Sequence, residues 1–131
     1  MSFLLIKIIQ YDEERGEKVS CIFCLIAEKQ IPSQCVYESD KVIAFRDLNP
    51  QAPVHILIIP KMHITSMNDI NTENSNVIAE IFETINKIAE SEGIKDSGYR
   101  VISNCGDDGC QSVKHLHFHI LGGRKLSETL S

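Results

Sequence analysis

Residues 111–121 read Q-S-V-K-H-L-H-F-H-I-L, with His115, His117 and His119 at alternate positions. Because successive side chains of a β-strand project from opposite faces, this alternation predicts a strand over 113–121. The three imidazoles then share one face, and the apolar residues between them face the hydrophobic core. Since each buried imidazole needs a hydrogen-bond partner, three of them on one face indicate a functional site rather than a purely structural strand.

Three kinds of chemistry remain open for this row of histidines. Two imidazoles and a carboxylate from elsewhere in the chain can hold a metal ion that activates water. One imidazole can instead act as a nucleophile that its neighbours orient, or the row can bind an anion without turnover. The preceding segment, C-G-D-D-G at 105–109, can surround a phosphate with its backbone N–H groups, which favours phosphate chemistry over a metal centre.

Periodic patterns elsewhere predict an α+β domain, with an antiparallel sheet of about five strands, one long helix and a short N-terminal helix. Apolar residues at helical spacing indicate the long helix over 75–92, and Gly93 suits a left-handed position after its last turn. The short helix is expected at 24–29, before Pro32. The apolar face of the long helix consists of Val77, Ile78, Ile81, Phe82, Ile85, Ile88 and Ala89. Strands are expected at 36–38, 42–45, 54–59, 99–103 and 113–121.

Length and charge describe a small acidic domain. The chain has 131 residues, and its 13 Lys plus Arg against 18 Asp plus Glu leave a net charge of −5. Without a basic run, the protein is a poor candidate for binding a nucleic acid polymer. We also expect no membrane association, because the apolar run at 3–9 is short and is interrupted by Lys7.

The first 18 residues are expected to form an N-terminal extension to a domain that occupies 19–131. The apolar run at 3–9 favours an additional strand or a flap, and the charged stretch Y-D-E-E-R-G-E-K at 11–18 favours a solvated linker. The sequence has no feature of a secretory signal, and its number of cysteines, five, is odd. Both observations predict a reducing compartment and therefore a cytoplasmic protein.

The five cysteines differ in their expected roles. Cys21 and Cys24 form a C-x-x-C pair, whose two thiolates can bind one metal ion or can act as a redox dithiol. The spacing alone leaves both alternatives open. Cys35, Cys105 and Cys110 are expected to be ordinary small side chains.

Taken together, several segments resemble the histidine triad (HIT) family of nucleotide hydrolases and transferases, and within it the Hint branch. They are C-I-F-C-L-I at 21–26, V-Y-E-S-D-K-V at 36–42, H-I-L-I-I-P-K-M-H-I at 55–64, G-Y-R-V-I-S-N at 98–104 and H-L-H-F-H-I-L at 115–121. The resemblance covers about 19–124, with Cys110 in place of a glycine of the family's G-G-Q-S run. It implies a HIT-like α+β fold, a homodimer, purine nucleotides such as AMP or GMP as ligands, and no organic cofactor.

The resemblance further implies a purine nucleoside phosphoramidase, a hydrolase of P–N and P–O bonds in compounds such as adenosine phosphoramidate or AMP-lysine. His117 is then the nucleophile that attacks the α-phosphorus and carries a nucleotidyl-histidine intermediate. The implied catalytic residues are His55, Ser112, His115, His117 and His119. A dinucleoside polyphosphate hydrolase of the same family and a nucleotide-binding adaptor with incidental turnover are the alternatives.

Two sets of ligand-binding residues also follow from the resemblance. In the first set, Asp47 accepts hydrogen bonds from the ribose, and Phe45 and Leu48 lie against the base. The implied nucleotide-binding residues are Phe45, Asp47, Leu48, Asn104, Gly109, Gln111, Ser112, His117 and His119. The implied ligands of a structural, non-catalytic zinc ion are Cys21, Cys24, His63 and His115. Four protein ligands leave such an ion no open coordination position.

Overall fold

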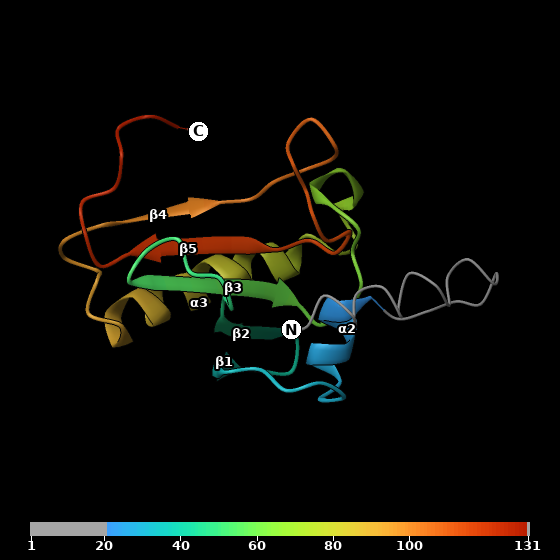
Figure 1. The fold of residues 1–131 in the computed structure, drawn as a ribbon. Coiled ribbons are helices and arrows are strands. Elements are labelled where there is room, and N and C mark those ends of the chain that lie inside the picture. The colour runs from blue at the N-terminus through green and yellow to red at the C-terminus, as the bar shows by residue number, and fades with distance from the viewer. Residues whose placement is uncertain (1–20, 131) are drawn as a thin grey trace.

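The computed structural model describes residues 21–130, so the expected N-terminal extension, with its strand or flap, lies outside the described residues. Figure 1 shows how the elements are arranged. The helices are α2 (Ile22–Ala27), the 3-10 helix η1 (Met67–Asp69) and α3 (Asn76–Ser91). The strands are β1 (Cys35–Glu38), β2 (Val42–Arg46), β3 (Val54–Pro60), β4 (Tyr99–Ile102) and β5 (Phe118–Gly122).

These five strands form one antiparallel sheet in the order β1-β2-β3-β5-β4, which confirms the predicted α+β class. β3 is the central strand, and both of its faces are covered. Its nearly continuous apolar run suits this position, because side chains on both faces are buried. β5 pairs with β3 so that His119 lies opposite Leu57, and Leu121 lies opposite His55. The register therefore brings two histidines from distant parts of the sequence onto the same face of the sheet.

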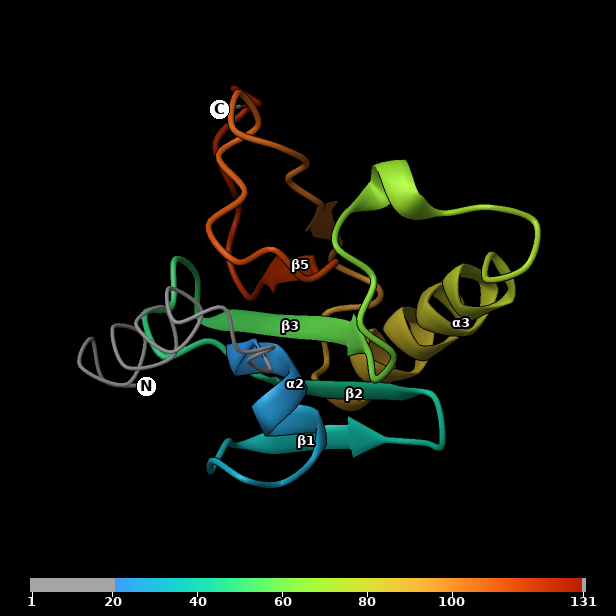
Figure 2. The same ribbon diagram turned by 90° about the vertical axis from the view of Figure 1, so that its right-hand side faces the viewer.

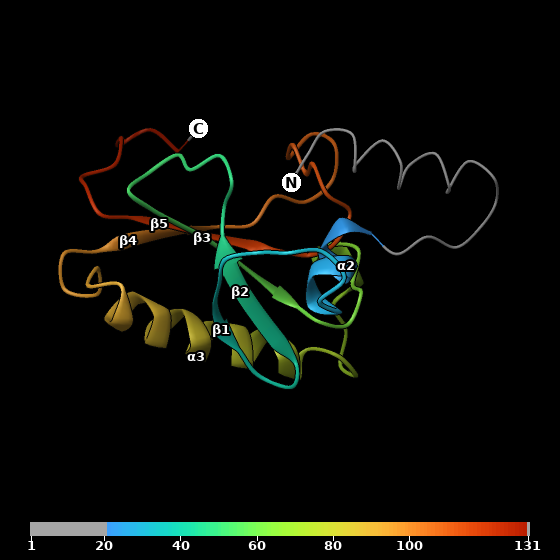
Figure 3. The same ribbon diagram turned by 60° about the horizontal axis from the view of Figure 1, so that its bottom comes forward.

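The sheet separates two hydrophobic clusters. One face carries Ile56 and Ile58 and packs against α3, whereas the opposite face carries Phe45 and Leu57 and packs against α2. The two helices are seen on different sides of the sheet (Figure 2 and Figure 3). His119 shares a face with its partner Leu57, so His55 and His119 lie on the side of the sheet away from α3.

The last strand is shorter than the alternating pattern predicts, because β5 begins at Phe118 rather than at position 113. Leu116, within residues 113–117, instead bonds to the segment that follows β3. The N–H of Leu116 donates to the carbonyl of Ile64 at 2.7 Å. The alternation of side chains nevertheless persists, because Leu116, Phe118 and Ile120 are all buried in the cluster beside α3, as expected.

α3 occupies nearly the predicted range, but its buried face differs from the prediction at two positions. Ile81 and Ile85 are buried as expected, whereas Phe82 is 54% exposed and Thr84 is only 1% exposed. Successive residues of an α-helix are about 100° apart around its axis. Phe82, which follows the central core residue Ile81, therefore projects toward the edge of the buried face of α3. The Phe82 ring lies there, with its centroid 5.7 Å from that of Phe118.

Backbone geometry accounts for three local features. α2 begins two residues earlier than expected, because Cys21 caps it: the Sγ atom of Cys21 accepts the N–H of Cys24 at 3.2 Å. Gly93 has a φ of 74°, the left-handed conformation predicted for it. Cys110 has a φ of 61°, which explains why glycine suits this position in the family's motif. Within 21–130, no helix is long and apolar enough to cross a membrane.

Candidate functional site

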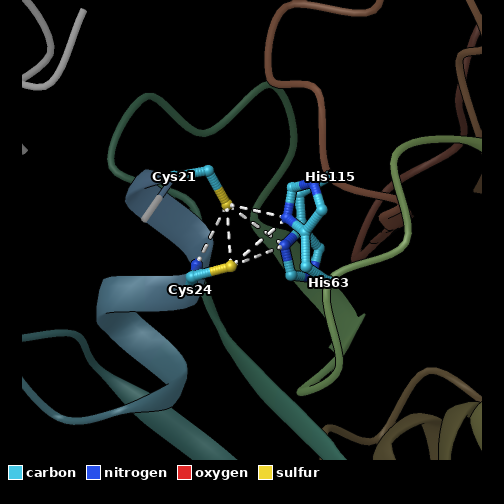
Figure 4. Close-up of side chains that lie close together, drawn as sticks. All are labelled: Cys21, Cys24, His63 and His115. Atoms are coloured by element: carbon cyan, nitrogen blue, oxygen red, sulfur yellow. Dashed lines mark hydrogen bonds between the residues drawn. The ribbon is translucent and has the colours of Figure 1, made fainter. Parts of the chain in front are cut away.

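Four sulfur- and nitrogen-bearing side chains meet beside the first turn of α2 (Figure 4). They are Cys21, Cys24, His63 and His115, which we call the Cys/His cluster. The two Sγ atoms are 3.2 Å apart, and each lies 3.2–3.5 Å from the Nδ1 atoms of both imidazoles. The structure thus brings together all four residues that the sequence suggests as zinc ligands.

Three separate segments supply these ligand atoms. Both cysteines belong to the start of α2, His63 follows β3, and His115 precedes β5. The Nε2 atom of His115 lies 2.8 Å from the carbonyl oxygen of Pro60, deep in the protein. Because a carbonyl oxygen only accepts, Nε2 carries the hydrogen and the Nδ1 lone pair faces the sulfurs.

The Cys/His cluster fits a closed tetrahedral zinc site. Two thiolates and two neutral imidazoles are a common donor set for structural zinc. With Zn–S and Zn–N bonds of about 2.3 and 2.0 Å, the sulfur–nitrogen edges of a tetrahedron are about 3.5 Å long. The observed sulfur–nitrogen separations of 3.2–3.5 Å are close to that length. Such an ion has four protein ligands and no position for a substrate.

His117 is 3% exposed, and one backbone hydrogen bond sets its orientation. Its Nδ1 atom lies 2.7 Å from the carbonyl oxygen of His115. Since that oxygen only accepts, Nδ1 carries the hydrogen and Nε2 carries the lone pair. Burial lowers the pKa of His117, which favours the neutral ring at physiological pH. The result is a buried, neutral imidazole whose Nε2 atom is a potential nucleophile.

A chain of hydrogen bonds orders the neighbouring rings of His55 and His119. The backbone N–H of Gln51 donates to the Nδ1 atom of His55 at 3.0 Å, so the hydrogen of the neutral ring is on Nε2. That Nε2 atom lies 2.9 Å from Nδ1 of His119 and 3.5 Å from Oδ2 of Asp47. His119 therefore accepts at Nδ1 and, when neutral, presents its Nε2–H as a donor.

The protonation of these two rings also bears on metal binding. Burial, reinforced by the nearby His117 and His55 rings, lowers the pKa of His119 to about 4. Burial likewise lowers the pKa of His55, against the opposing effect of the Asp47 carboxylate. The ligand atoms of Asp47, His55 and His119 lie within 4.8 Å of one another. Nε2 of His55 nevertheless carries a hydrogen rather than a free lone pair, so the geometry favours a hydrogen-bonded chain over a metal centre here.

A pocket of about 230 Å³ lies next to these histidines, on the α2 side of the sheet. Six of the residues that the sequence suggests for nucleotide binding line it. They are Phe45, Asp47, Leu48, Ser112, His117 and His119. The carboxylate of Asp47 is held at the rim by the N–H of Asn49, which donates to Oδ1 at 2.7 Å.

Three other residues suggested for nucleotide binding do not line this pocket. The side chain of Gln111 is buried, and its amide bonds to three backbone groups of the surrounding loops. The side-chain amide of Asn104 donates to the carbonyl of Gly109 at 2.7 Å. These hydrogen bonds hold the shape of the 104–111 loop, which leads into Ser112.

Phe23 was not among the residues that the sequence suggests for the site, although it lies between the two cysteines of the C-I-F-C segment. Its ring centroid is 5.1 Å from that of His117 and 5.9 Å from that of His115, and it also lines the pocket. The one available signal was its position between Cys21 and Cys24, since the short helix is predicted to begin only at residue 24. The remaining unanticipated pocket residues are Ile26, Pro32, Ser33, Arg46, Asn49, Leu57 and Val113.

The fold and the site define a small α+β domain with neutral histidines lining a pocket and a Cys/His cluster beside it. A family model described as "HIT domain" matches residues 28–126 of the chain. Since this match covers most of the chain, the protein belongs to the HIT family.

Similar proteins include enzymes, a zinc-binding protein and solved structures. The purine nucleoside phosphoramidase of Escherichia coli (strain K12) is 47% identical over 110 residues, which cover 84% of this chain and 92% of that protein. The 14 kDa zinc-binding protein of Zea mays is 47% identical over 108 residues, covering 81% of this chain and 84% of that protein. The structure of a histidine triad protein from Clostridium difficile shares 53% identity with a TM-score of 0.83, covering 86% of this chain and 98% of that chain.

Proposed function

We propose that this protein hydrolyses purine nucleoside phosphoramidates through a nucleotidyl-histidine intermediate on His117. The observation that carries the proposal is the state of the His117 ring, which is buried, neutral and bonded through Nδ1–H to a carbonyl. Its Nε2 lone pair is therefore available at a pocket wall. The 47% identity with the E. coli purine nucleoside phosphoramidase supports the substrate class.

In the proposed reaction, Nε2 of His117 attacks the α-phosphorus, the P–N bond breaks, and the leaving nitrogen takes up a proton from solvent and departs as the amine. Hydrolysis of the intermediate in the second step returns that proton to solvent. Ser112, which is exposed at the pocket, donates a hydrogen bond to the leaving group. The Nε2–H of His119 donates to a phosphate oxygen, where negative charge develops. Water then attacks the nucleotidyl-histidine, which releases the nucleoside monophosphate and regenerates His117. His55 and His115 act through their hydrogen bonds to His119 and His117.

The nucleoside is proposed to occupy the more apolar part of the same pocket. Phe45 and Leu48 offer apolar surface to a purine, and the Asp47 carboxylate offers acceptors to the ribose hydroxyls. AMP and GMP are the proposed products. Asn104 and Gln111, with the Gly109 backbone, are proposed to shape the loop that approaches the phosphate.

We also propose that the Cys/His cluster binds a structural zinc ion. Its donor set, its dimensions and the Nδ1 lone pair of His115 support this, and so does the name of the maize relative. The ion fixes the start of α2 to the segments around His63 and His115. It supplies structure only, because all four positions are taken by protein ligands.

Three broader features belong to the same proposal. The HIT domain occupies 19–131 and follows an extension at 1–18. A second copy docks along β4, whose Tyr99 and Val101 are exposed apolar residues, to form a homodimer. The free state of the cysteines supports a reducing compartment such as the cytoplasm.

Replacement of the nucleophile tests the proposed reaction. His117→Ala is expected to lower the release of AMP from adenosine phosphoramidate by about 10,000-fold or more, because no covalent intermediate can form. Binding of AMP, measured by calorimetry, is expected to persist. Cys35→Ser, at an exposed thiol on β1, is the control and should retain activity. Undiminished turnover by His117→Ala contradicts the nucleophile assignment.

A substrate panel tests the proposed substrate class. We expect the wild type to hydrolyse adenosine phosphoramidate and adenylated lysine faster than dinucleoside polyphosphates. A preference for dinucleoside polyphosphates would favour the other hydrolase of the family, and binding of AMP without any turnover would favour an adaptor.

A further inference from the structure

His115 belongs both to the Cys/His cluster and to the surroundings of His117. Its Nδ1 atom faces the Sγ atoms at 3.2 and 3.5 Å, while its carbonyl oxygen accepts from Nδ1 of His117 at 2.7 Å. Its Nε2 atom is bonded to the carbonyl of Pro60. A shift of the His115 backbone, which the contacts of its side chain hold in place, therefore moves the acceptor that determines which nitrogen of His117 carries the hydrogen.

Phe23 makes a second connection between the cluster and His117. It lies in α2 between Cys21 and Cys24, and it is 4% exposed. Its ring meets the rings of His115 and His117 edgewise, at interplanar angles of 78° and 79°. Because edge-to-face contacts between rings are directional, Phe23 limits the tilt of the His117 ring.

α2 has six residues, which is too short for a helix to be stable by itself. Two sets of contacts hold it in place. Ile22, Phe23 and Ile26 pack against the sheet, and the cysteines at its first turn face His63 and His115 (Figure 4). A metal ion bound by the cluster is therefore expected to fix the same turn that carries Phe23.

We propose that Phe23 is a positioning residue for the nucleophile, and that α2 and His115 transmit the occupancy of the metal site to His117. This inference rests on the proposed roles of His117 and of the Cys/His cluster. Loss of the metal ion loosens Phe23 and His115, so that His117 populates its other tautomer. The metal-free protein then loses turnover.

Phe23→Leu separates positioning from metal binding, because all four ligands remain. The zinc-loaded variant is expected to contain as much zinc as the wild type and to lower kcat about 10-fold. Because Phe23 also lines the pocket, KM is expected to change as well, so the tautomer of His117 rather than KM identifies the positioning role. Phe82→Leu is the matched control. Phe82 also makes an edgewise ring contact, with Phe118 at a centroid distance of 5.7 Å, but it lies on α3. The control is expected to keep the wild-type kcat.

Nitrogen-15 NMR of the histidine rings, recorded without substrate, measures the tautomer of His117 directly. A substitution that only lowers the stability of the fold would leave this tautomer unchanged. In the zinc-loaded wild type, His117 is expected to show one tautomer, with the hydrogen on Nδ1. After zinc is removed with a chelator, and in zinc-loaded Phe23→Leu, we expect a mixture of tautomers. Adding zinc back to the metal-free wild type should restore the single tautomer.

The possible outcomes are distinct. A wild-type kcat and a single His117 tautomer in zinc-loaded Phe23→Leu would overturn the role of Phe23. An unchanged His117 spectrum after zinc removal would overturn the coupling between the metal site and His117. This comparison uses the wild type, so it tests the proposal even if Phe23→Leu does not fold. Absence of turnover in the zinc-loaded wild type would instead refute the proposed function, while the tautomer measurement still tests the coupling.

Discussion

At the scale of single residues, hydrogen bonds to backbone groups decide which nitrogen each buried histidine presents. His115 and His117 both donate to carbonyl oxygens, but through Nε2 in one case and Nδ1 in the other. His55 instead accepts a backbone N–H at Nδ1 and donates from Nε2. One type of side chain can therefore act as a metal ligand, a nucleophile or a donor within the same small region.

The lowered pKa of His119 predicts a pH-dependent stability. In the folded protein this pKa is about 4, against an ordinary value of 6.5 that applies to the unfolded chain. Between these values the unfolded chain binds the additional proton, so the free energy of unfolding decreases as the pH falls. The slope for one proton is at most about 1.4 kcal/mol per pH unit.

Denaturant unfolding at a series of pH values between neutrality and about pH 4 measures this slope. His119→Gln removes the titrating group and is expected to give a shallower dependence than the wild type. Identical slopes for the two proteins would show that His119 does not contribute.

The Cys/His cluster predicts a zinc content that depends on each ligand. His63→Ala removes one of the four ligands, so the purified variant should contain much less zinc than the wild type. Cys35→Ser alters an exposed cysteine outside the cluster and should leave the zinc content unchanged. Elemental analysis makes the measurement, and a metal content near zero in the wild type would reject the site.

At the scale of elements, the two helices contribute differently to the sheet. α3 presents one apolar face and covers the larger core cluster, including Ile56 and Ile58. α2 is too short to cover a core alone, but together with its N-cap Cys21 it supplies two cluster ligands and two pocket residues, Phe23 and Ile26. α3 therefore covers most of the core, whereas α2 borders the candidate site.

The orientation of α3 predicts unequal effects of two neighbouring substitutions. Ile81 is fully buried, so Ile81→Ala is expected to lower the free energy of unfolding by about 2–5 kcal/mol through loss of apolar contacts and creation of a cavity. Phe82 is 54% exposed, and Phe82→Ala should cost less than half as much. Urea denaturation of both variants provides the comparison, and equal losses would contradict the observed orientation.

At the scale of the whole molecule, β1 and β4 form the edges of the sheet within the part of the chain that the structure describes. β4 carries Tyr99 and Val101, which are 36% and 38% exposed. An edge strand with exposed apolar residues is a surface on which a second copy can pair. The proposed homodimer uses this edge.

A charge on β4 tests that assembly. Val101→Lys places a positive charge on the proposed interface of both copies, so the variant is expected to be monomeric where the wild type is dimeric. Met62→Lys is the control, because Met62 is 65% exposed and lies outside the sheet. Sedimentation velocity distinguishes the two masses, and a dimeric Val101→Lys would place the interface elsewhere.

Much of the architecture could be predicted because its signals are local. The α+β class, the long helix and the left-handed Gly93 all follow from patterns within a few residues, and the structure bears them out. The start of β5 could not be predicted in this way. Residues 113–117 alternate as a strand does, but the N–H of Leu116 donates to Ile64, in the segment after β3, rather than to a neighbouring strand.

The candidate site likewise has features that local sequence predicts and features that depend on the tertiary structure. The sequence by itself determined the candidate residues, since H-L-H-F-H and C-I-F-C identify histidines and cysteines whose side chains the structure brings to one region. Tertiary structure alone decided their states: that Pro60 faces Nε2 of His115, that Gln51 faces Nδ1 of His55, and that Phe23 meets His117. The physical reason is that residue type and spacing are properties of a short segment. Tautomer, burial and pKa instead depend on backbone groups and rings that only the folded chain places opposite each nitrogen.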